Sequence, residues 1–176
     1  MKCRFFALFL MLPTLVSANQ EISSSFQGYS GLINTPTTDL FNSGEFYFQY
    51  SNQAELFGAY RNRANFNFGM GLWDFVEISA RNAAHTESLN LGSDLSANIK
   101  IVVPYIPKDW FKLAIGIQDL GGASSASLLD AKYAVASKEL LGNFNLSLGI
   151  GKSDSNEGRL NGIFGGISWQ ANDWAK

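Results

Sequence analysis

The sequence is poor in the residues that support disulfides, metal sites and nucleic-acid binding. It has one cysteine and one histidine, and Cys3 lies in an N-terminal segment that we expect to be removed. Disulfide and thiol chemistry and a multi-histidine metal site are therefore excluded, and we expect no cofactor. Acidic residues outnumber basic ones, 15 to 13. The basic face of a nucleic-acid-binding protein is therefore not expected.

Residues 1–18 have the features of a secretory signal peptide. Lys2 and Arg4 precede an apolar run, and Val16 and Ala18 are small residues at the positions that signal peptidase reads. We therefore expect Sec-type export and cleavage before Asn19. Loss of the two basic residues takes the formal net charge from −2 to −4. No later stretch approaches the ~20 apolar residues of a transmembrane helix.

Charged residues are also scarce, at 16% of the chain against about 25% in soluble domains. Aromatic residues make up 14% of the sequence, and there are 17 glycines. On an exported chain, few charges combined with many aromatics and glycines favour an outer-membrane β-barrel.

Apolar residues recur at every second position in several segments, which is the pattern of β-strands. In 65–72, for example, Phe66, Phe68 and Met70 share one face, and asparagines and glycines occupy the other. Seven segments alternate in this way: 46–51, 65–72, 73–81, 94–103, 111–118, 143–151 and 162–170. An eighth, 125–141, is rich in helix formers, but its alternation favours a strand over a short helix. Eight strands are the usual minimum for a closed membrane barrel.

The polar faces of these segments consist of small residues with few charges, whereas the exposed face of a soluble sheet carries many. Small polar side chains suit the interior of a barrel. The sequence therefore predicts an all-β fold, an antiparallel transmembrane β-barrel of roughly eight strands or the first part of a larger barrel. The candidate polar residues facing its lumen are Glu77, Arg81, Asp94, Ser96, Asn98 and Lys100.

Aromatic residues near the segment ends would anchor such a barrel at the depth of the lipid headgroups. They are Tyr60, Trp73, Tyr105, Trp110, Trp169 and Trp174. The alternative is a secreted or periplasmic β-sandwich that buries these aromatics and binds a glycan or a protein partner.

Residues 19–44 show neither helical nor strand periodicity, and they precede the expected strands of 45–176. Gly31 permits close backbone approach, and Asn34-Thr35-Pro36 predicts a turn in which Thr35 is extended. We hypothesise an ordered lead-in that packs into or against one mouth of the barrel. A plain surface loop is the alternative.

No enzymatic activity is expected. Glu77 and Arg81 lie four residues apart on an inward face, and paired acids and bases can catalyse reactions. An ion-pair ladder inside a barrel is the favoured interpretation of these two residues together with Asp94 and Lys100. The sequence contains no nucleophile–base arrangement and no metal-ligand spacing.

Six stretches in order carry a family resemblance: GYSGLINTPTTD, FNFGMGLWDFVEISAR, DLSANIKIVVP, LAIGIQDLGG, KYAVASKEL and FNLSLGIG. Together they resemble the N-terminal part of the YjbH family, outer-membrane proteins associated with exopolysaccharide and capsule production in Gram-negative bacteria. The resemblance implies a transmembrane β-barrel that exports or assembles surface polysaccharide. The implied partners are outer-membrane lipid, the polysaccharide and export proteins encoded nearby. Family members are longer, which implies that this chain corresponds to their first portion.

Overall fold

The computed structural model describes residues 22–52, 63–85, 94–107, 109–120, 130–140, 144–154 and 160–169. Ten strands and no helix occur in these ranges. No described helix is long and apolar enough to cross a membrane.

Eight strands form one antiparallel sheet in which each strand pairs with its neighbours in sequence. They are β3 (Phe46–Ser51), β4 (Arg63–Leu72), β5 (Val76–His85), β6 (Asp94–Val102), β7 (Lys112–Gln118), β8 (Ala131–Leu140), β9 (Phe144–Lys152) and β10 (Gly162–Trp169). All eight expected strands are confirmed. The contested segment 125–141 contains strand β8, so its alternation outweighs its helix propensity.

The two edges of this sheet, β3 and β10, each pair on one side only among the described residues. The all-β, antiparallel part of the fold prediction is confirmed, whereas no closed barrel is found in the described part of the chain. Two further strands of two residues each, β1 (Gly31–Leu32) and β2 (Thr35–Pro36), form a separate small hairpin.

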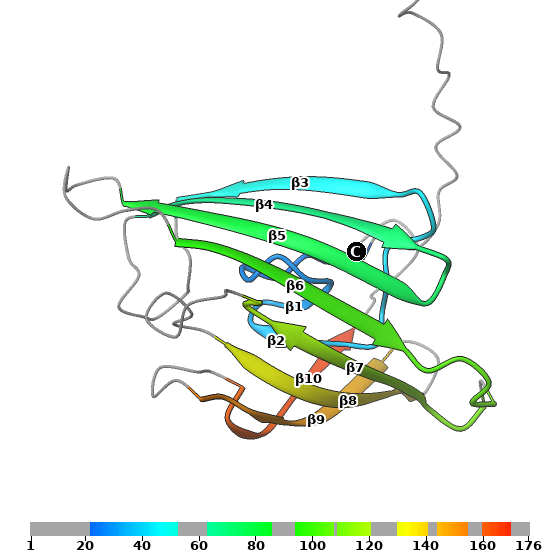
Figure 1. Ribbon diagram of the computed structural model, residues 1–176. Coiled ribbons are helices and arrows are strands. Elements are labelled where there is room, and N and C mark those ends of the chain that lie inside the picture. The colour runs from blue at the N-terminus through cyan, green and yellow to red at the C-terminus, as the bar shows by residue number, and fades with distance from the viewer. Residues whose placement is uncertain are drawn as a thin grey trace, which may run out of the picture.

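The large sheet curls strongly, so that β3–β6 and β7–β10 face each other with β1 and β2 between them (Figure 1). The concave face of the sheet is therefore covered by residues 22–44, which we call the lead-in segment. The convex face is covered by no other described element (Figure 1).

The two faces of the sheet have the reverse of the polarity expected in a soluble protein. Buried side chains on the concave face include Asn65, Ser79 and Asn98. On the convex face, Leu95 is 70% exposed and Ile150 is 61% exposed. Polar residues thus line most of the interior and apolar residues cover most of the exterior, as the alternation predicts. Strand β8 is an exception, because its apolar residues Tyr133 and Val135 are buried on the concave side.

The two ends of the sheet differ in their connections. At one end β4 joins β5 through 73–75, and β8 joins β9 through 141–143. We call this the short-turn end; β6 also joins β7 there, through 103–111. Trp73 and Asp74 have φ angles of 52° and 58°, which allow a tight reversal between β4 and β5. At the opposite end, segments 52–62, 86–93, 119–130 and 153–161 connect the strands, and each is longer than the three-residue connections 73–75 and 141–143.

Candidate functional site: the lead-in segment and the concave wall

The lead-in segment is among the most buried parts of the molecule. Ser25 and Ser30 are inaccessible to solvent, and Tyr29 and Phe41 are 1% and 3% exposed. The segment is held in shape by its own backbone, since the N–H of Phe26 donates to the carbonyl of Ile33 at 2.9 Å. It therefore forms an ordered body inside the curled sheet.

The four lead-in residues singled out from the sequence form one hairpin. Gly31 pairs with Pro36 in the β1–β2 ladder, and Asn34 lies in the turn before Thr35. A Cβ on Gly31 would collide with the carbonyl oxygen of Thr35, so this close approach requires glycine. The Tyr29 hydroxyl donates to the Asn34 carbonyl at 3.0 Å. Burial raises the pKa of the Tyr29 phenol above its ordinary value, so the ring stays neutral in this interior.

The concave face of the large sheet, which we call the concave wall, carries an ion pair that holds the centre of the lead-in segment. Glu77 of β5 and Lys100 of β6 are register partners, and both side chains are 1% exposed. Their Oε2 and Nζ atoms lie 3.6 Å apart. The backbone N–H of Ser30 donates to Glu77 Oε1 at 2.7 Å, and Lys100 Nζ donates to the Ser30 carbonyl at 2.8 Å. The Ser30 hydroxyl also donates to Glu77 and accepts from Lys100.

Side-chain amides on the same wall bind the backbone of the lead-in segment. Asn65 Nδ2 donates to the carbonyl of Phe26 at 2.9 Å, and Asn67 Nδ2 reaches the same carbonyl at 3.3 Å. Asn98 Nδ2 donates to the carbonyl of Gln27 at 2.9 Å. A polar wall and an irregular segment thus satisfy each other, because backbone carbonyls that leave water need donors.

The remaining polar candidates lie on the same wall. Arg81 is 2% exposed and donates to the side-chain oxygen of Gln27. Ser96 is buried and is the register partner of Arg81. Asp94 begins β6, but its side chain lies outside the described residues. The structure therefore brings five of the six candidates to one buried surface: Glu77, Arg81, Ser96, Asn98 and Lys100.

The expected ion-pair ladder takes a specific form. Glu77 pairs with Lys100 on the next strand, because antiparallel register places the two side by side. Arg81 is directed to Gln27 of the lead-in segment. The hydrogen-bond partners of these polar side chains therefore include groups of the lead-in segment.

Contacts of the lead-in segment reach both edges of the sheet. The Tyr47 hydroxyl of β3 donates to the Gly28 carbonyl, and the Tyr47 ring stacks on Phe41 with centroids 4.4 Å apart. On the other side, a Cβ on Gly166 of β10 would meet Leu32. The segment therefore connects two edge strands that do not pair with each other in the described part of the chain.

Sequence reasoning did not identify Ser30, Gln27 or the asparagines of β4 as site residues. Asn65 and Asn67 could have been found, because they occupy the polar face of the clearest alternating segment. Ser30 carries no local signal. Its role depends on a contact 47 residues away in the chain.

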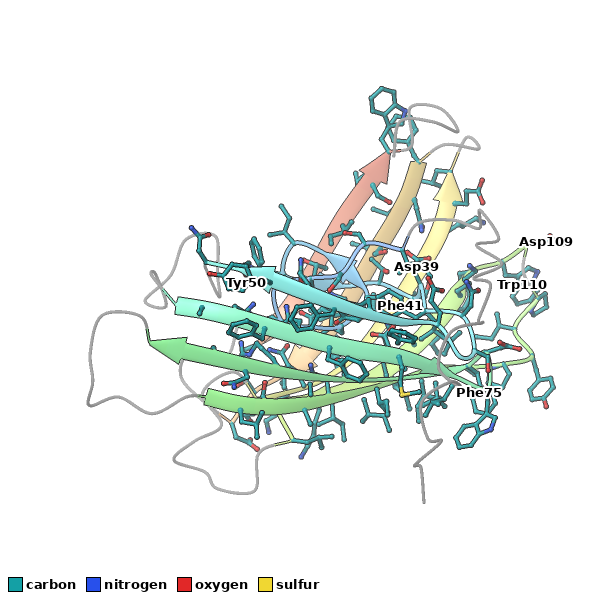
Figure 2. The ribbon with its side chains drawn as sticks, turned by 90° about the horizontal axis from the view of Figure 1, so that it is seen from above. Asp39, Phe41, Tyr50, Phe75, Asp109 and Trp110 are labelled. Atoms are coloured by element: carbon teal, nitrogen blue, oxygen red, sulfur yellow. The ribbon has the colours of Figure 1, made fainter. Side chains whose placement is uncertain are left out.

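Two adjoining cavities open at the short-turn end, with volumes of about 680 Å³ and 310 Å³. Both are lined by Thr38, Asp39, Phe111 and Lys112. Figure 2 shows Phe75, Asp109 and Trp110 at this end of the sheet, with Tyr50 toward the opposite end. Among the residues that the structure describes, no group of three His, Cys, Asp or Glu side chains is placed to hold a metal ion.

Comparison with known proteins identifies the family. A search of curated proteins found no match, and a search of solved structures found none either. A family model described as "Exopolysaccharide biosynthesis protein YbjH" matches residues 23–175, which include all but the first residue of the lead-in segment and all eight strands of the large sheet. This match confirms the resemblance drawn from the six sequence stretches. The chain belongs to the YjbH family of exopolysaccharide biosynthesis proteins.

Proposed function

We propose that this chain is an outer-membrane β-barrel protein, alone or as the first part of a larger barrel, that serves the export or assembly of exopolysaccharide. The reversed polarity of the curled sheet carries this proposal. Apolar side chains on the convex face would contact lipid tails, and the polar concave face would surround the lumen. Family membership supplies the link to exopolysaccharide.

The exposed apolar side chains are too numerous and too evenly spread for an ordinary soluble surface. They come from every strand of the large sheet and include Phe48, Phe68, Ile78, Leu95, Ile115, Leu148 and Ile167, whereas β8 contributes only Leu140 at its end. The convex side of β8 instead carries Ala134 and Ala136 between Lys132 and Lys138. This arrangement supports a lipid-facing band whose charges lie near the strand ends.

The connections support an orientation in the membrane. Barrels of the bacterial outer membrane have short periplasmic turns and longer extracellular loops. The short-turn end would therefore face the periplasm. Trp73 and Trp169 lie at this end and are 69% and 63% exposed, as expected for aromatics at the headgroup level.

In lipid, the edges of the open sheet require partners. An unpaired backbone group in hydrocarbon costs several kcal/mol. In the proposed barrel, β3 and β10 therefore pair with each other or with additional strands. Closure is the feature that separates a barrel from an open sheet with the same strand order.

Fractionation of cells that express the chain tests membrane insertion. An integral barrel should remain in outer membranes washed with carbonate and should migrate faster on gels when it is not heated. Recovery of a freely soluble periplasmic protein would reject the barrel and would favour the sandwich that binds a glycan or a protein partner.

A separate experiment tests the role in export. A strain that lacks the chain should release less exopolysaccharide than its parent, and re-expression should restore the release. The intracellular sugar precursors should remain at parental levels if the defect is in export or assembly. Unchanged release in the deletion strain would reject this role while leaving the barrel untouched.

A further inference from the structure

The two cavities at the short-turn end share four lining residues and form one groove. Three parts of the chain enclose its narrower section. They are the lead-in segment at Thr38 and Asp39, residues 109–112, and the ends of β8 and β9 at Ser137–Glu139 and Asn145. We call this the mouth groove. Its two parts, about 680 Å³ and 310 Å³, fall in the size range of sites for small molecules.

We propose that the mouth groove binds a neutral saccharide. This inference rests on the proposed function and adds to it a site and a class of ligand. Four features of the groove point to such a ligand: its aromatic rings, two buried oxygen atoms that find no partner in the described part of the chain, the sign of its charges and its fixed geometry.

The aromatic rings of the groove come from the 103–111 connection. Trp110 and Phe111 line the smaller part, and Tyr105 and Phe111 line the larger part. Trp110 is 65% exposed, although an aromatic ring of that size gains much from burial. The electron-rich face of an indole attracts the C–H groups that pyranose rings present on their flat faces. An exposed tryptophan beside a polar cavity is therefore a suitable platform for a sugar ring.

Two buried oxygen atoms of residues that line the groove have no hydrogen-bond partner among the described residues. They are Oγ1 of Thr38 and Oδ1 of Asn145, and both residues line the smaller cavity. Thr38 is only 2% exposed. Buried polar atoms in folded proteins nearly always have a partner, which a ligand can supply. Sugar hydroxyls can donate to both oxygens and can also accept from the threonine hydroxyl.

The charges of the groove select among saccharides. Its described lining contains Asp39, Asp74, Asp109 and Glu139 but only Lys112 and Lys138 as bases. Carboxylates accept strong hydrogen bonds from hydroxyl groups. They also repel other anions, so uronic-acid and phosphate-bearing chains are disfavoured. This balance indicates a neutral saccharide.

The position of Thr38 is fixed by the concave wall. Its backbone N–H donates to Ser137 Oγ at 3.2 Å, and Ser137 Oγ lies 2.7 Å from Ser147 Oγ on the next strand. The lead-in segment thus presents the Thr38 hydroxyl in a constant place relative to β8 and β9. A preorganised site of this kind loses little entropy when it binds.

Calorimetric titration of the full chain in detergent micelles tests the proposal. The probes are cellohexaose and maltohexaose as neutral saccharides and hexagalacturonic acid as the anionic comparison. We expect saturable binding of at least one neutral hexaose and at least tenfold weaker binding of the uronate. Absence of binding by both neutral probes, or preference for the uronate, would overturn the proposal.

Three variants locate the site, each checked for heat-modifiable gel mobility. Trp110→Ala should weaken binding of the neutral hexaose at least tenfold, and Thr38→Val should weaken it several-fold without changing the shape of the side chain. Trp169→Ala is the matched control, because this exposed tryptophan does not line the groove. If Trp110→Ala does not fold, the affinity of Thr38→Val decides. Binding of wild-type strength by whichever of these two variants folds would refute the site.

The outcomes separate the site from the proposed function. A membrane-embedded chain that binds neither neutral hexaose overturns the mouth groove alone. A chain that binds them but stays soluble in the periplasm overturns the barrel alone.

Discussion

Glu77 and Lys100 face each other across β5 and β6, and Ser30 of the lead-in segment bonds to both of them. The pair is thus anchored in two directions, across the sheet and toward the segment that covers it. Because both side chains are 1% exposed, each charge depends on the other and on Ser30 for the interactions that water would otherwise supply.

Lys100→Met should destabilise the fold by about 3–5 kcal/mol, because it leaves the buried Glu77 carboxylate without its cation. Glu77→Gln/Lys100→Met should recover part of this loss, since no charge then remains unpaired. Urea-induced unfolding in detergent, followed by tryptophan fluorescence, measures both. Strict additivity of the single Glu77→Gln and Lys100→Met effects would show that the two residues do not act as a pair.

Gly71→Ala should disrupt the junction between the lead-in segment and the sheet. An added Cβ would collide with the backbone carbonyl oxygens of Phe41 and Asn42, which the chain cannot move without moving the segment. Gly166→Ala is the matched control, because its Cβ would meet the flexible end of the Leu32 side chain.

Limited proteolysis gives the readout for this pair of variants. We expect faster cleavage within residues 22–44 in Gly71→Ala than in Gly166→Ala. Equal cleavage rates would mean that the contact of Gly71 with Phe41 and Asn42 does not hold the segment in place.

Ile115→Arg tests whether the convex face meets lipid. Ile115 lies in the middle of β7 and is 49% exposed. In a membrane, arginine at mid-depth costs about 2–4 kcal/mol, whereas near the interface it costs about 0–1 kcal/mol. Ile163→Arg, near the start of β10 and the long-loop end, is therefore the matched control.

Unfolding in lipid vesicles measures the two arginine variants. A soluble surface would tolerate both within about 0.5 kcal/mol. Equal stabilities of Ile115→Arg and Ile163→Arg would accordingly argue against a lipid-facing sheet.

Deletion of residues 28–38 should raise the permeability of proteoliposomes to small hydrophilic solutes, if the sheet forms a closed barrel in the membrane. The deleted residues include Ser30 and the β1–β2 hairpin, and the hairpin lies between the two halves of the sheet (Figure 1). Liposome swelling in sugar solutions measures the change.

A less disruptive variant provides a second test in case the deletion variant does not fold. Gln27→Ala/Ser30→Ala removes the side-chain bonds to Arg81, Glu77 and Lys100 but keeps the chain length. A smaller rise in permeability is expected from this variant. Unchanged swelling in both proteins would mean that the segment does not obstruct a passage.

The sequence by itself determined the strands and the two faces of each strand. Successive side chains of a strand point to opposite sides, so the spacing of Phe66, Phe68 and Met70 specifies one face without any knowledge of the neighbours. Segment 125–141, where helix propensity competes, contains β8 as its alternation predicts. Its apolar set, which includes Tyr133 and Val135, is however buried inside and not exposed outside, so alternation did not decide which face turns inward there. The family resemblance could also be drawn from the sequence, because it rests on short motifs in a fixed order and requires no knowledge of contacts in space.

Tertiary structure alone decided which partners those faces meet. The cross-strand register, which local periodicity does not encode, placed Lys100 rather than Arg81 beside Glu77. Curling of the sheet then brought Ser30 within hydrogen-bond distance of residues 47 and 70 positions away in the chain. The physical reason is that hydrogen bonds and burial depend on distances in space, and only the curled shape of the sheet converts distant sequence positions into neighbours.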